Sequence, residues 1–216
     1  MTKWSIALIL TLVLNGLAVE NKFDQGLLKN GDIIFQTSMS SQSKAIQLAT
    51  HSPYSHCGLV YIRNNSVYVF EASTKVKRTP LKRFLKKGEG GMFVVKRFKN
   101  SDSLLNTQNL GKMEAEGKKF EGLPYDSYFG WGNDRIYCSE LIYKIYDNAL
   151  GIKIGKTQQI KDFDLSNPVV ASKLAERYGG KTPMDEIVIS PSSQFDDPGL
   201  IEVFNNYPLN PKTQHN

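Results

Sequence analysis

Hydrophobic and polar positions follow two different periods along this chain. Short apolar or alternating runs predict strands at residues 32–36, 56–62, 67–72, 93–98, 186–190 and 200–204. Apolar residues at helical spacing predict helices at residues 41–50, 80–87, 103–120, 137–150 and 169–178. Because strands cluster in the first half and helices dominate the second, we predict an α+β fold, with a mostly antiparallel sheet packed against helices.

The second and third predicted strands form a hairpin with two polar residues on one face. Asn64 and Asn65, between the strands, tolerate positive φ and suit a tight turn. If they are the turn residues, Gly58 faces Glu71, and His56 lies diagonal to Glu71. If the turn moves back by one residue, His56 and Glu71 face each other directly. In either register a carboxylate neighbours the imidazole of His56. Gly58 is expected to leave open space beside this imidazole.

The helix predicted at residues 137–150 carries a cysteine in its first turn. One apolar stripe contains positions 138, 141, 142, 145, 146 and 149, so the Cys138 thiol is expected on the buried face. Asn133 or Asp134 is expected to help begin the helix. The positive end of the helix dipole favours the thiolate form of a cysteine at this place.

Few side chains in this chain can supply a thiol nucleophile and its base, because there are two cysteines and three histidines. If the helix docks its stripe on the sheet, Cys138 meets His56, and Glu71 holds the other imidazole nitrogen. In this set Cys138 is the nucleophile, His56 is the general base, and Glu71 is the residue that orients the imidazole. The alternative is a core cysteine, a lone strand histidine and an edge glutamate. His51 suits a helix end and has no second metal ligand at a suitable spacing, and His215 lies at the C-terminus.

The N-terminus has the pattern of a targeting segment. Lys3 precedes an apolar run at residues 6–14, and Gly16 and Ala18 fit the small-x-small cleavage rule. The run is short for a bilayer span. We therefore predict a signal peptide at residues 1–18, export to the periplasm or outside the cell, and no transmembrane segment in the mature chain. A buried or amphipathic N-terminal helix is the alternative.

The remainder of the chain has the composition of a globular protein, with 40% hydrophobic and 22% charged residues. Residues 19–216 are expected to form a single domain, with a core at about 30–150 and an extension at 151–216. Export changes how the cysteines are interpreted, because an oxidising compartment could join Cys57 to Cys138. Otherwise the two cysteines are one reactive thiol and one buried residue that takes no part in the chemistry.

The ordered motifs resemble those of a known family, the YiiX-like cysteine hydrolases. The matching segments are residues 31–36 (GDIIFQ), 45–50 (AIQLAT), 54–60 (YSHCGLV), 70–72 (FEA), 122–126 (GLPYD) and 137–141 (YCSEL). These enzymes are circularly permuted papain-like proteins related to NlpC-type cell-wall amidases, and their histidine precedes the cysteine, as it does here. The resemblance implies a permuted papain-like fold, and a Cys-His-Glu triad at Cys138, His56 and Glu71.

The resemblance also implies an amide substrate, such as a peptide or a cell-wall-derived bond, cleaved through a thioester. Tyr125 lies 13 residues before Cys138, much like a tyrosine near the thiol in NlpC-type enzymes. Its phenol could donate a hydrogen bond to a developing oxyanion, or its ring could simply pack at an interface. The backbone N–H of Cys138 is the other expected donor. Tyr128, Phe129 and Trp131 could line a substrate groove or pack in the core.

Two other functions remain open at this point. Permuted papain-like folds also include lipid-directed acyltransferases and phospholipases, and a non-catalytic binding module could keep the fold. The net charge of +6 and the basic stretch between residues 75 and 87 could attract an anionic polymer or lipid, although a solvated basic surface is the simpler interpretation. The sequence has no glycine-rich phosphate loop or nucleic-acid motif. We therefore expect no cofactor, no metal and no nucleic-acid partner.

Overall fold

A computed structural model describes residues 23–208 of the 216-residue chain. The predicted signal peptide at residues 1–18 and His215 lie outside the described residues. Within residues 23–208, every helix is too short or too polar to cross a membrane.

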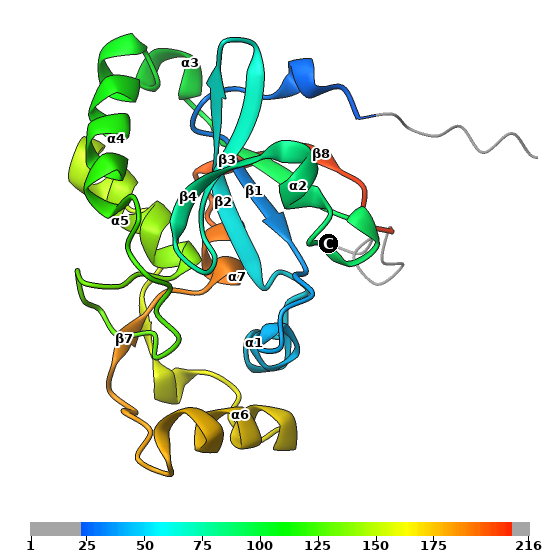
Figure 1. Ribbon diagram of the computed structural model, residues 1–216, viewed down its shortest axis with the longest axis vertical. Helices are drawn as coiled ribbons and strands as arrows, with labels where there is room; N and C mark the ends of the chain where they lie inside the picture. The colour runs from blue at the N-terminus through cyan, green and yellow to red at the C-terminus, as the bar shows by residue number, and fades with distance from the viewer. Residues whose placement is uncertain (1–22, 209–216) are drawn as a thin grey trace, which may run out of the picture.

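A six-stranded antiparallel sheet forms the centre of the molecule (Figure 1), in the order β4-β3-β2-β1-β5-β8. Its strands are β1 (Ile33–Gln36), β2 (His56–Arg63), β3 (Ser66–Ala72), β4 (Val76–Pro80), β5 (Val94–Phe98) and β8 (Leu200–Asn205). A separate two-stranded sheet pairs β6 (Gln158–Gln159) with β7 (Ile187–Val188). The predicted α+β class with a mostly antiparallel sheet is confirmed.

Helices surround this sheet on both sides. They are α1 (Ser43–Thr50), α2 (Leu81–Leu85), α3 (Ser101–Leu104), α4 (Thr107–Phe120), α5 (Cys138–Leu150), α6 (Pro168–Tyr178) and α7 (Pro191–Phe195), with single 3-10 turns at Gln25–Leu27, Glu89–Gly91 and Ile160–Asp162. Helices α4 and α5 lie together on one face of the sheet, and α2 belongs to the other face. Helices α1 and α6 contact each other below the sheet (Figure 1).

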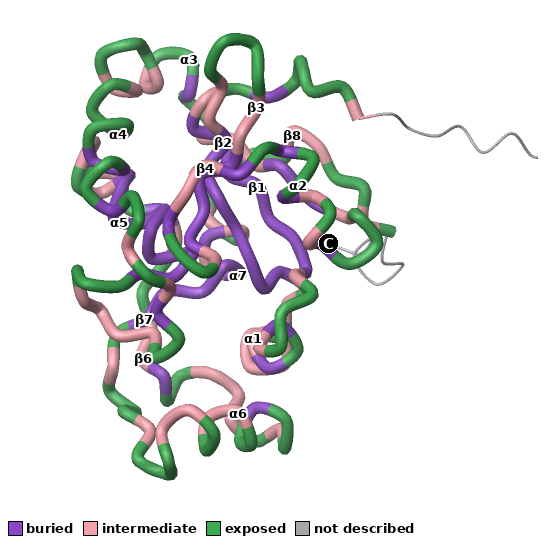
Figure 2. Tube along the Cα trace, viewed as in Figure 1, coloured by how far each residue is buried: buried purple, intermediate pink, exposed green. Residues whose placement is uncertain are grey.

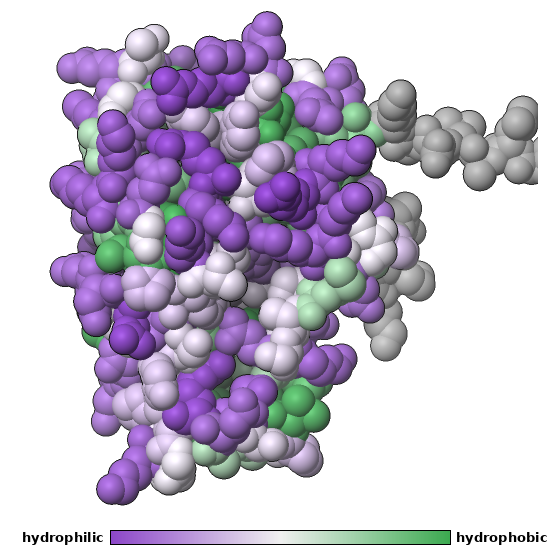
Figure 3. Space-filling view, in the orientation of Figure 1, coloured by the Kyte–Doolittle hydropathy of each residue, from purple (hydrophilic) through white to green (hydrophobic). Residues whose placement is uncertain are grey.

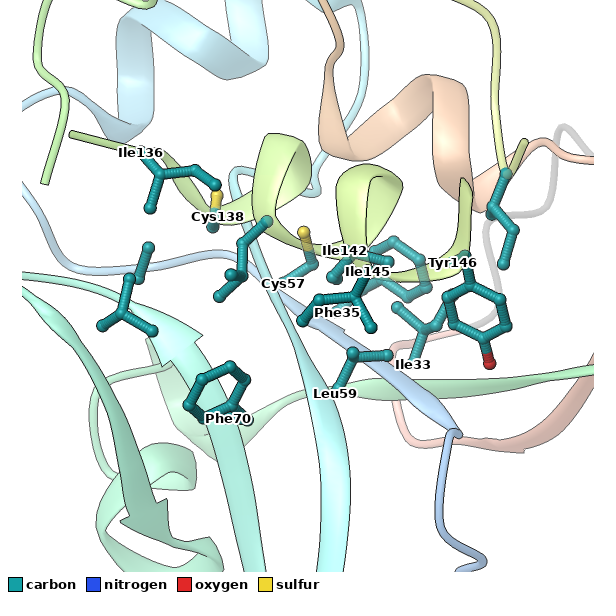
Figure 4. Close-up of a cluster of buried hydrophobic side chains, with 14 of the residues drawn as sticks. Ile33, Phe35, Cys57, Leu59, Phe70, Ile136, Cys138, Ile142, Ile145 and Tyr146 are labelled. Atoms are coloured by element: carbon teal, nitrogen blue, oxygen red, sulfur yellow. The ribbon is translucent and has the colours of Figure 1, made fainter. Parts of the chain in front are cut away.

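The hydrophobic core has two layers because the strands alternate their side chains between the two faces. On one face, Cys57 and Leu59 of β2 pack with Ile142 and Ile145 of α5 (Figure 4). On the other face, Val60 of β2 packs in a second cluster beneath α2. Figure 2 shows this burial as a continuous purple region through the strands and α5. By contrast, the face of the molecule in Figure 3 is mostly hydrophilic.

Two predicted elements differ from the structure, and one strand is absent from the prediction. The helix predicted at 103–120 is two helices, because Asn106 begins α4 by accepting a hydrogen bond from the Asn109 N–H at 3.0 Å. The strand predicted at 186–190 is only the two-residue β7. Strand β4 was not predicted, because the cationic residues that surround Val76 and Thr79 made this segment resemble a solvated surface.

The β2–β3 hairpin adopts the first of the two registers considered. Asn64 and Asn65 have φ values of 49° and 58°, and Val60 lies opposite Val69. The expectation of open space beside Gly58 is wrong. A Cβ atom at Gly58 would lie 2.4 Å from Val69 Cγ1, because the valine of the neighbouring strand already occupies that volume. Glycine therefore permits the close approach of the two strands at this point.

Replacing Gly58 with alanine is expected to lower the free energy of unfolding by about 1–3 kcal/mol, because the added methyl group overpacks the sheet. Urea denaturation measures the change. Gly111→Ala is the matched control, since a Cβ on this helical glycine meets nothing within 4 Å and should stabilise α4 by up to about 1 kcal/mol. Equal unfolding midpoints for the two variants would contradict the packing argument.

Candidate active site

His56 and Glu71 form a buried pair between the start of β2 and the end of β3. His56 Nε2 lies 2.6 Å from Glu71 Oε2, and the carboxylate is fully buried. The other oxygen, Oε1, accepts hydrogen bonds from Thr79 Oγ1 at 2.6 Å and from Lys87 Nζ at 2.7 Å. Burial alone would raise the pKa of Glu71, but these three partners outweigh it and lower the pKa to about 2. Glu71 is therefore ionised across the physiological range.

Cys138 is the first residue of α5 and is 3% exposed. Hydrogen bonding from the Cys57 thiol lowers its pKa, burial opposes this, and the charge and hydrogen bonding of His56 lower it further. The net effect holds the pKa of Cys138 well below the ordinary range. In contrast, burial first and the neighbouring Cys138 second raise the pKa of Cys57 well above that range. Of the two thiols, Cys138 is the one that ionises.

The end of the β2–β3 ladder lies next to Cys138. The final pair of that ladder is Leu59 with Phe70, so the backbone N–H of Cys57 lies beyond it and helps to lower the pKa of Cys138. Cys57 and Cys138 lie near each other in Figure 4, and both thiols are free. The structure therefore does not contain the disulfide between Cys57 and Cys138 that was considered as an alternative.

The pKa of His56 responds to both the carboxylate and the sulfur. Burial lowers its pKa, but the Cys138 thiolate and then the Glu71 carboxylate raise it, to about 9 in total. Since Nε2 is bonded to Glu71, Nδ1 is the nitrogen left for the sulfur. The ring also stacks on Phe84, with centroids 5.6 Å apart. The two shifts therefore favour a thiolate and an imidazolium in this pair.

Tyr125 completes this group of side chains. Its hydroxyl accepts a hydrogen bond from Gln42 Nε2 at 2.8 Å, which leaves its own proton free to be donated. Burial, and after it the charge of Cys138, raises the pKa of Tyr125 well above its usual value, so the side chain stays a neutral phenol. Gln42 is itself held by Arg177 Nη2 at 2.9 Å. A relay of side chains thus connects α6, through the residue that precedes α1, to the tyrosine.

The beginning of α5 differs from the prediction. Neither Asn133 nor Asp134 begins the helix; the residue before its first turn is Tyr137, whose N–H donates to Glu140 Oε2 at 3.4 Å. Asn133 instead accepts a hydrogen bond from Lys144 Nζ at 3.2 Å. Asp134 lies 3.6 Å from Arg135. The side chains predicted as caps are therefore committed to cations rather than to the helix amides.

Four polar residues that the sequence analysis did not assign to the site support it. They are Gln42, Thr79, Lys87 and Gln194. Gln194 of α7 donates to the Ser139 carbonyl at 2.9 Å, and its Oε1 lies 3.6 Å from Cys57 Sγ. Of these four residues, only Lys87 could have been suggested by the sequence. It belongs to the basic stretch, and a buried carboxylate attracts a cation. The spacing of the other three gives no indication of the contact.

A cavity of about 110 Å³ opens beside Cys138. Its walls come from α1, from α6 and from the segment that precedes α6, and Tyr125 and Phe129 also line it. The other two aromatic residues do not line it: Tyr128 is exposed, with its ring 5.9 Å from the Tyr178 ring, and the Trp131 ring packs 5.5 Å from the Tyr143 ring. The segment after residue 150 therefore contributes to the site.

Comparison with known proteins agrees with this fold. Residues 27–204 match the family described as permuted papain-like amidase enzymes, YaeF/YiiX, C92 family. The chain is 50% identical over 181 residues to the uncharacterized protein YiiX of Escherichia coli strain K12, which covers 84% of this chain and 88% of YiiX. The crystal structure of metalloprotein yiiX from Escherichia coli O157:H7 matches with a TM-score of 0.80 at 50% identity, over 83% of this chain and 98% of that chain.

The family match extends beyond residues 30–150, where the sequence motifs lie, and includes most of the segment after residue 150. It therefore covers both the hairpin that carries His56 and Glu71 and the helices that line the cavity. On this evidence the chain belongs to the YaeF/YiiX (C92) family of permuted papain-like amidases.

Proposed function

We propose that this protein hydrolyses an amide bond with Cys138 as nucleophile, His56 as general acid and base, and Glu71 as the residue that orients the imidazole. One observation carries the proposal: the buried Glu71 carboxylate lies 2.6 Å from His56 Nε2, and the same imidazole helps to lower the pKa of the Cys138 thiol. A thiolate and imidazolium pair of this kind is poised for attack on an acyl carbon.

The steps follow from the protonation states. The Cys138 sulfur attacks the carbonyl carbon, and the carbonyl oxygen becomes an oxyanion. The Tyr125 hydroxyl and the Cys138 N–H are the donors we assign to it. The imidazolium gives its Nδ1 proton to the leaving nitrogen, and the C–N bond breaks to leave a thioester. His56 then takes a proton from water, the hydroxide attacks the thioester, and the thiolate returns as the acid departs.

The substrate and location are part of the proposal. The family description supports an amide, and we propose an acyl-amide or peptide bond, with cell-wall fragments as one source. We also propose export, which rests on the signal-peptide pattern of residues 1–18. The basic stretch offers Lys82, Arg83 and Lys86 as exposed cations, whereas Lys87 is engaged with Glu71.

No step is assigned to a metal. The related yiiX is called a metalloprotein in the name of its crystal structure. Among residues 23–208 of this chain, however, the His, Cys, Asp and Glu side chains do not gather in any group of three that could hold a metal ion. The donors present therefore do not fit such a site.

The pH dependence of Cys138 alkylation tests the proposal. An ordinary thiol gains on the order of 100-fold in reactivity between pH 6 and 8, because its thiolate fraction rises. Cys138 is expected to react with iodoacetamide at a nearly constant rate over this interval, because its pKa is low and His56 stays protonated up to about pH 9. Mass spectrometry of the digested protein measures the alkylation of Cys138 and of Cys57 separately.

His56→Ala should restore the steep rise at Cys138, since the cation that stabilises the thiolate is gone. Cys57 provides the internal control, because its raised pKa should keep it unreactive throughout. A wild-type profile for Cys138 that equals the His56→Ala profile would contradict the proposed pair.

A further inference from the structure

We infer that Cys57 is the resolving cysteine of this site: when a hydroperoxide oxidises Cys138, Cys57 closes a reversible disulfide with it. The structure contains the reduced form, in which both thiols are free. The disulfide would stop catalysis and would also protect Cys138 from irreversible oxidation. The loss and return of activity rest on the proposed function, whereas the chemistry of the two sulfurs does not depend on it.

Cys57 is held beside the first turn of α5. It is the second residue of β2, and its side chain belongs to the same buried cluster as Cys138 (Figure 4). Cys57 Sγ lies 3.6 Å from Gln194 Oε1, and Gln194 Nε2 donates to the carbonyl of Ser139 at 2.9 Å. One side-chain amide therefore connects the Cys57 thiol to the residue that follows Cys138 in α5.

Little holds the Cys57 thiol away from Cys138. Its contact with Gln194 Oε1 is a hydrogen bond from a thiol, which is a weak donor. Hydrogen bonding from the same thiol is the largest of the effects that lower the pKa of Cys138. Formation of the disulfide therefore replaces one weak hydrogen bond and the interaction between the two thiols by a covalent bond.

The two thiols differ in their access to a small oxidant. Cys138 is part of the lining of the cavity of about 110 Å³, whereas Cys57 is fully buried and does not line it. A hydroperoxide oxidises thiolates that it can reach, and the lowered pKa of Cys138 supplies the thiolate. The oxidant is therefore expected to react with Cys138 first.

Two steps lead to the disulfide. The Cys138 thiolate attacks one oxygen of the hydroperoxide, the O–O bond breaks, and hydroxide or alkoxide leaves, so that the sulfur is oxidised to a sulfenic acid and the peroxide is reduced. The Cys57 sulfur then attacks the Cys138 sulfur. The S–S bond forms, the S–O bond breaks, and the oxygen departs as water with the Cys57 proton. A dithiol reverses the result by thiol–disulfide exchange and is itself oxidised.

The protonation of Cys57 suits the second step and not the first. In the reduced protein, burial and then the hydrogen bond and charge of Cys138 raise the pKa of Cys57, so it does not compete for the oxidant. A sulfenic acid is neutral. After the first step, the charge of Cys138 therefore no longer opposes the loss of the Cys57 proton.

Such a pair fits the export that we propose. Outside the cytosol, thiols meet oxidants and are not kept reduced by the cytosolic systems. A lone reactive thiolate would pass from sulfenic to sulfinic and sulfonic acid, which dithiols do not reduce. Capture of the sulfenic acid by Cys57 stops the oxidation at a stage from which the nucleophile can be recovered.

Treatment of the reduced protein with hydrogen peroxide tests the inference. The wild-type protein is expected to lose about 2 Da in intact mass, as one disulfide forms. Trypsin should then leave residues 45–63, which contain Cys57, joined to residues 136–144, which contain Cys138. Amide hydrolysis should fall at least about tenfold and return to within about twofold after dithiothreitol.

Cys57→Ser is the matched variant, because it keeps a hydroxyl beside Gln194 and removes the resolving sulfur. Under the same treatment its Cys138 is expected to gain about 32 to 48 Da, as sulfinic and sulfonic acid, and dithiothreitol should not restore its activity. Cys57→Ala should give the same products and serves if Cys57→Ser does not fold.

The outcomes separate the inference from the proposed function. Equal rates of sulfinic and sulfonic acid formation at Cys138 in the wild type and in Cys57→Ser, with no joined tryptic pair, would overturn the inference. A disulfide between two molecules, seen as a doubled mass, would overturn it as well. A joined pair in a protein whose reduced form hydrolyses no amide would support the inference and overturn the proposed function.

Discussion

Cys138→Ser is expected to reduce amide hydrolysis by at least about 10⁴-fold while the protein stays folded, because an alcohol in this position is not ionised and cannot form the pair with His56. The substitution changes one buried atom and leaves the apolar stripe of α5 in place. The measurement is kcat/KM on the amide that the wild-type protein cleaves best, with the unfolding midpoint recorded for the same preparation.

Cys57→Ser is the matched control for that experiment. Its hydroxyl keeps a donor next to the Cys138 sulfur, so activity is expected to stay within about tenfold of the wild type. If Cys57→Ser lost activity as fully as Cys138→Ser, the assignment of the nucleophile to the start of α5 would be wrong.

Glu71→Gln is expected to reduce kcat on the order of 10²- to 10⁴-fold, because the neutral amide no longer stabilises the imidazolium or fixes its orientation. Glu71→Ala should also destabilise the fold, by about 3–5 kcal/mol, because Lys87 and His56 lose a buried partner. The readouts are kcat on the same amide and the free energy of unfolding in urea.

The same carboxylate gives a pH signature. The pKa of Glu71 is about 2 in the folded protein and 4.5 is its ordinary value, so its stabilisation is present above pH 4.5 and is lost as the pH falls toward 2. The stability advantage of the wild type over Glu71→Gln should therefore shrink by about 3 kcal/mol between pH 5 and 2. Glu121→Gln is the control, because its half-exposed pair with Arg78 should contribute less than about 1 kcal/mol. A constant difference across this pH range would refute the buried ion pair.

Local patterns were sufficient to predict much of this arrangement. The turn at Asn64 and Asn65 left two registers open, and in either one His56 was expected beside Glu71, 15 positions away, as the structure has it. The apolar stripe of α5 fixed which face of the helix carries Cys138. Both inferences needed only neighbouring residues and the rule that an apolar face is buried.

The supports of the site were not predictable in the same way. Lys87 belongs to a run of like charges, and only the unpredicted strand β4 and the short α2 turn this one cation toward Glu71. Gln42 and Arg177 are separated by 135 positions, and their contact depends on how α6 docks on α1. Such contacts come from tertiary packing, and no periodicity in the sequence encodes them.

The place of β8 has a consequence for how the molecule is made. Strand β8, at residues 200–205, pairs with β5, which is synthesised about a hundred residues earlier. Until the final strand arrives, one side of β5 has open backbone groups beside the buried Val94 and Val95, which is the kind of edge on which chains aggregate. A nascent or truncated chain that lacks residues 200–205 therefore exposes this edge of β5.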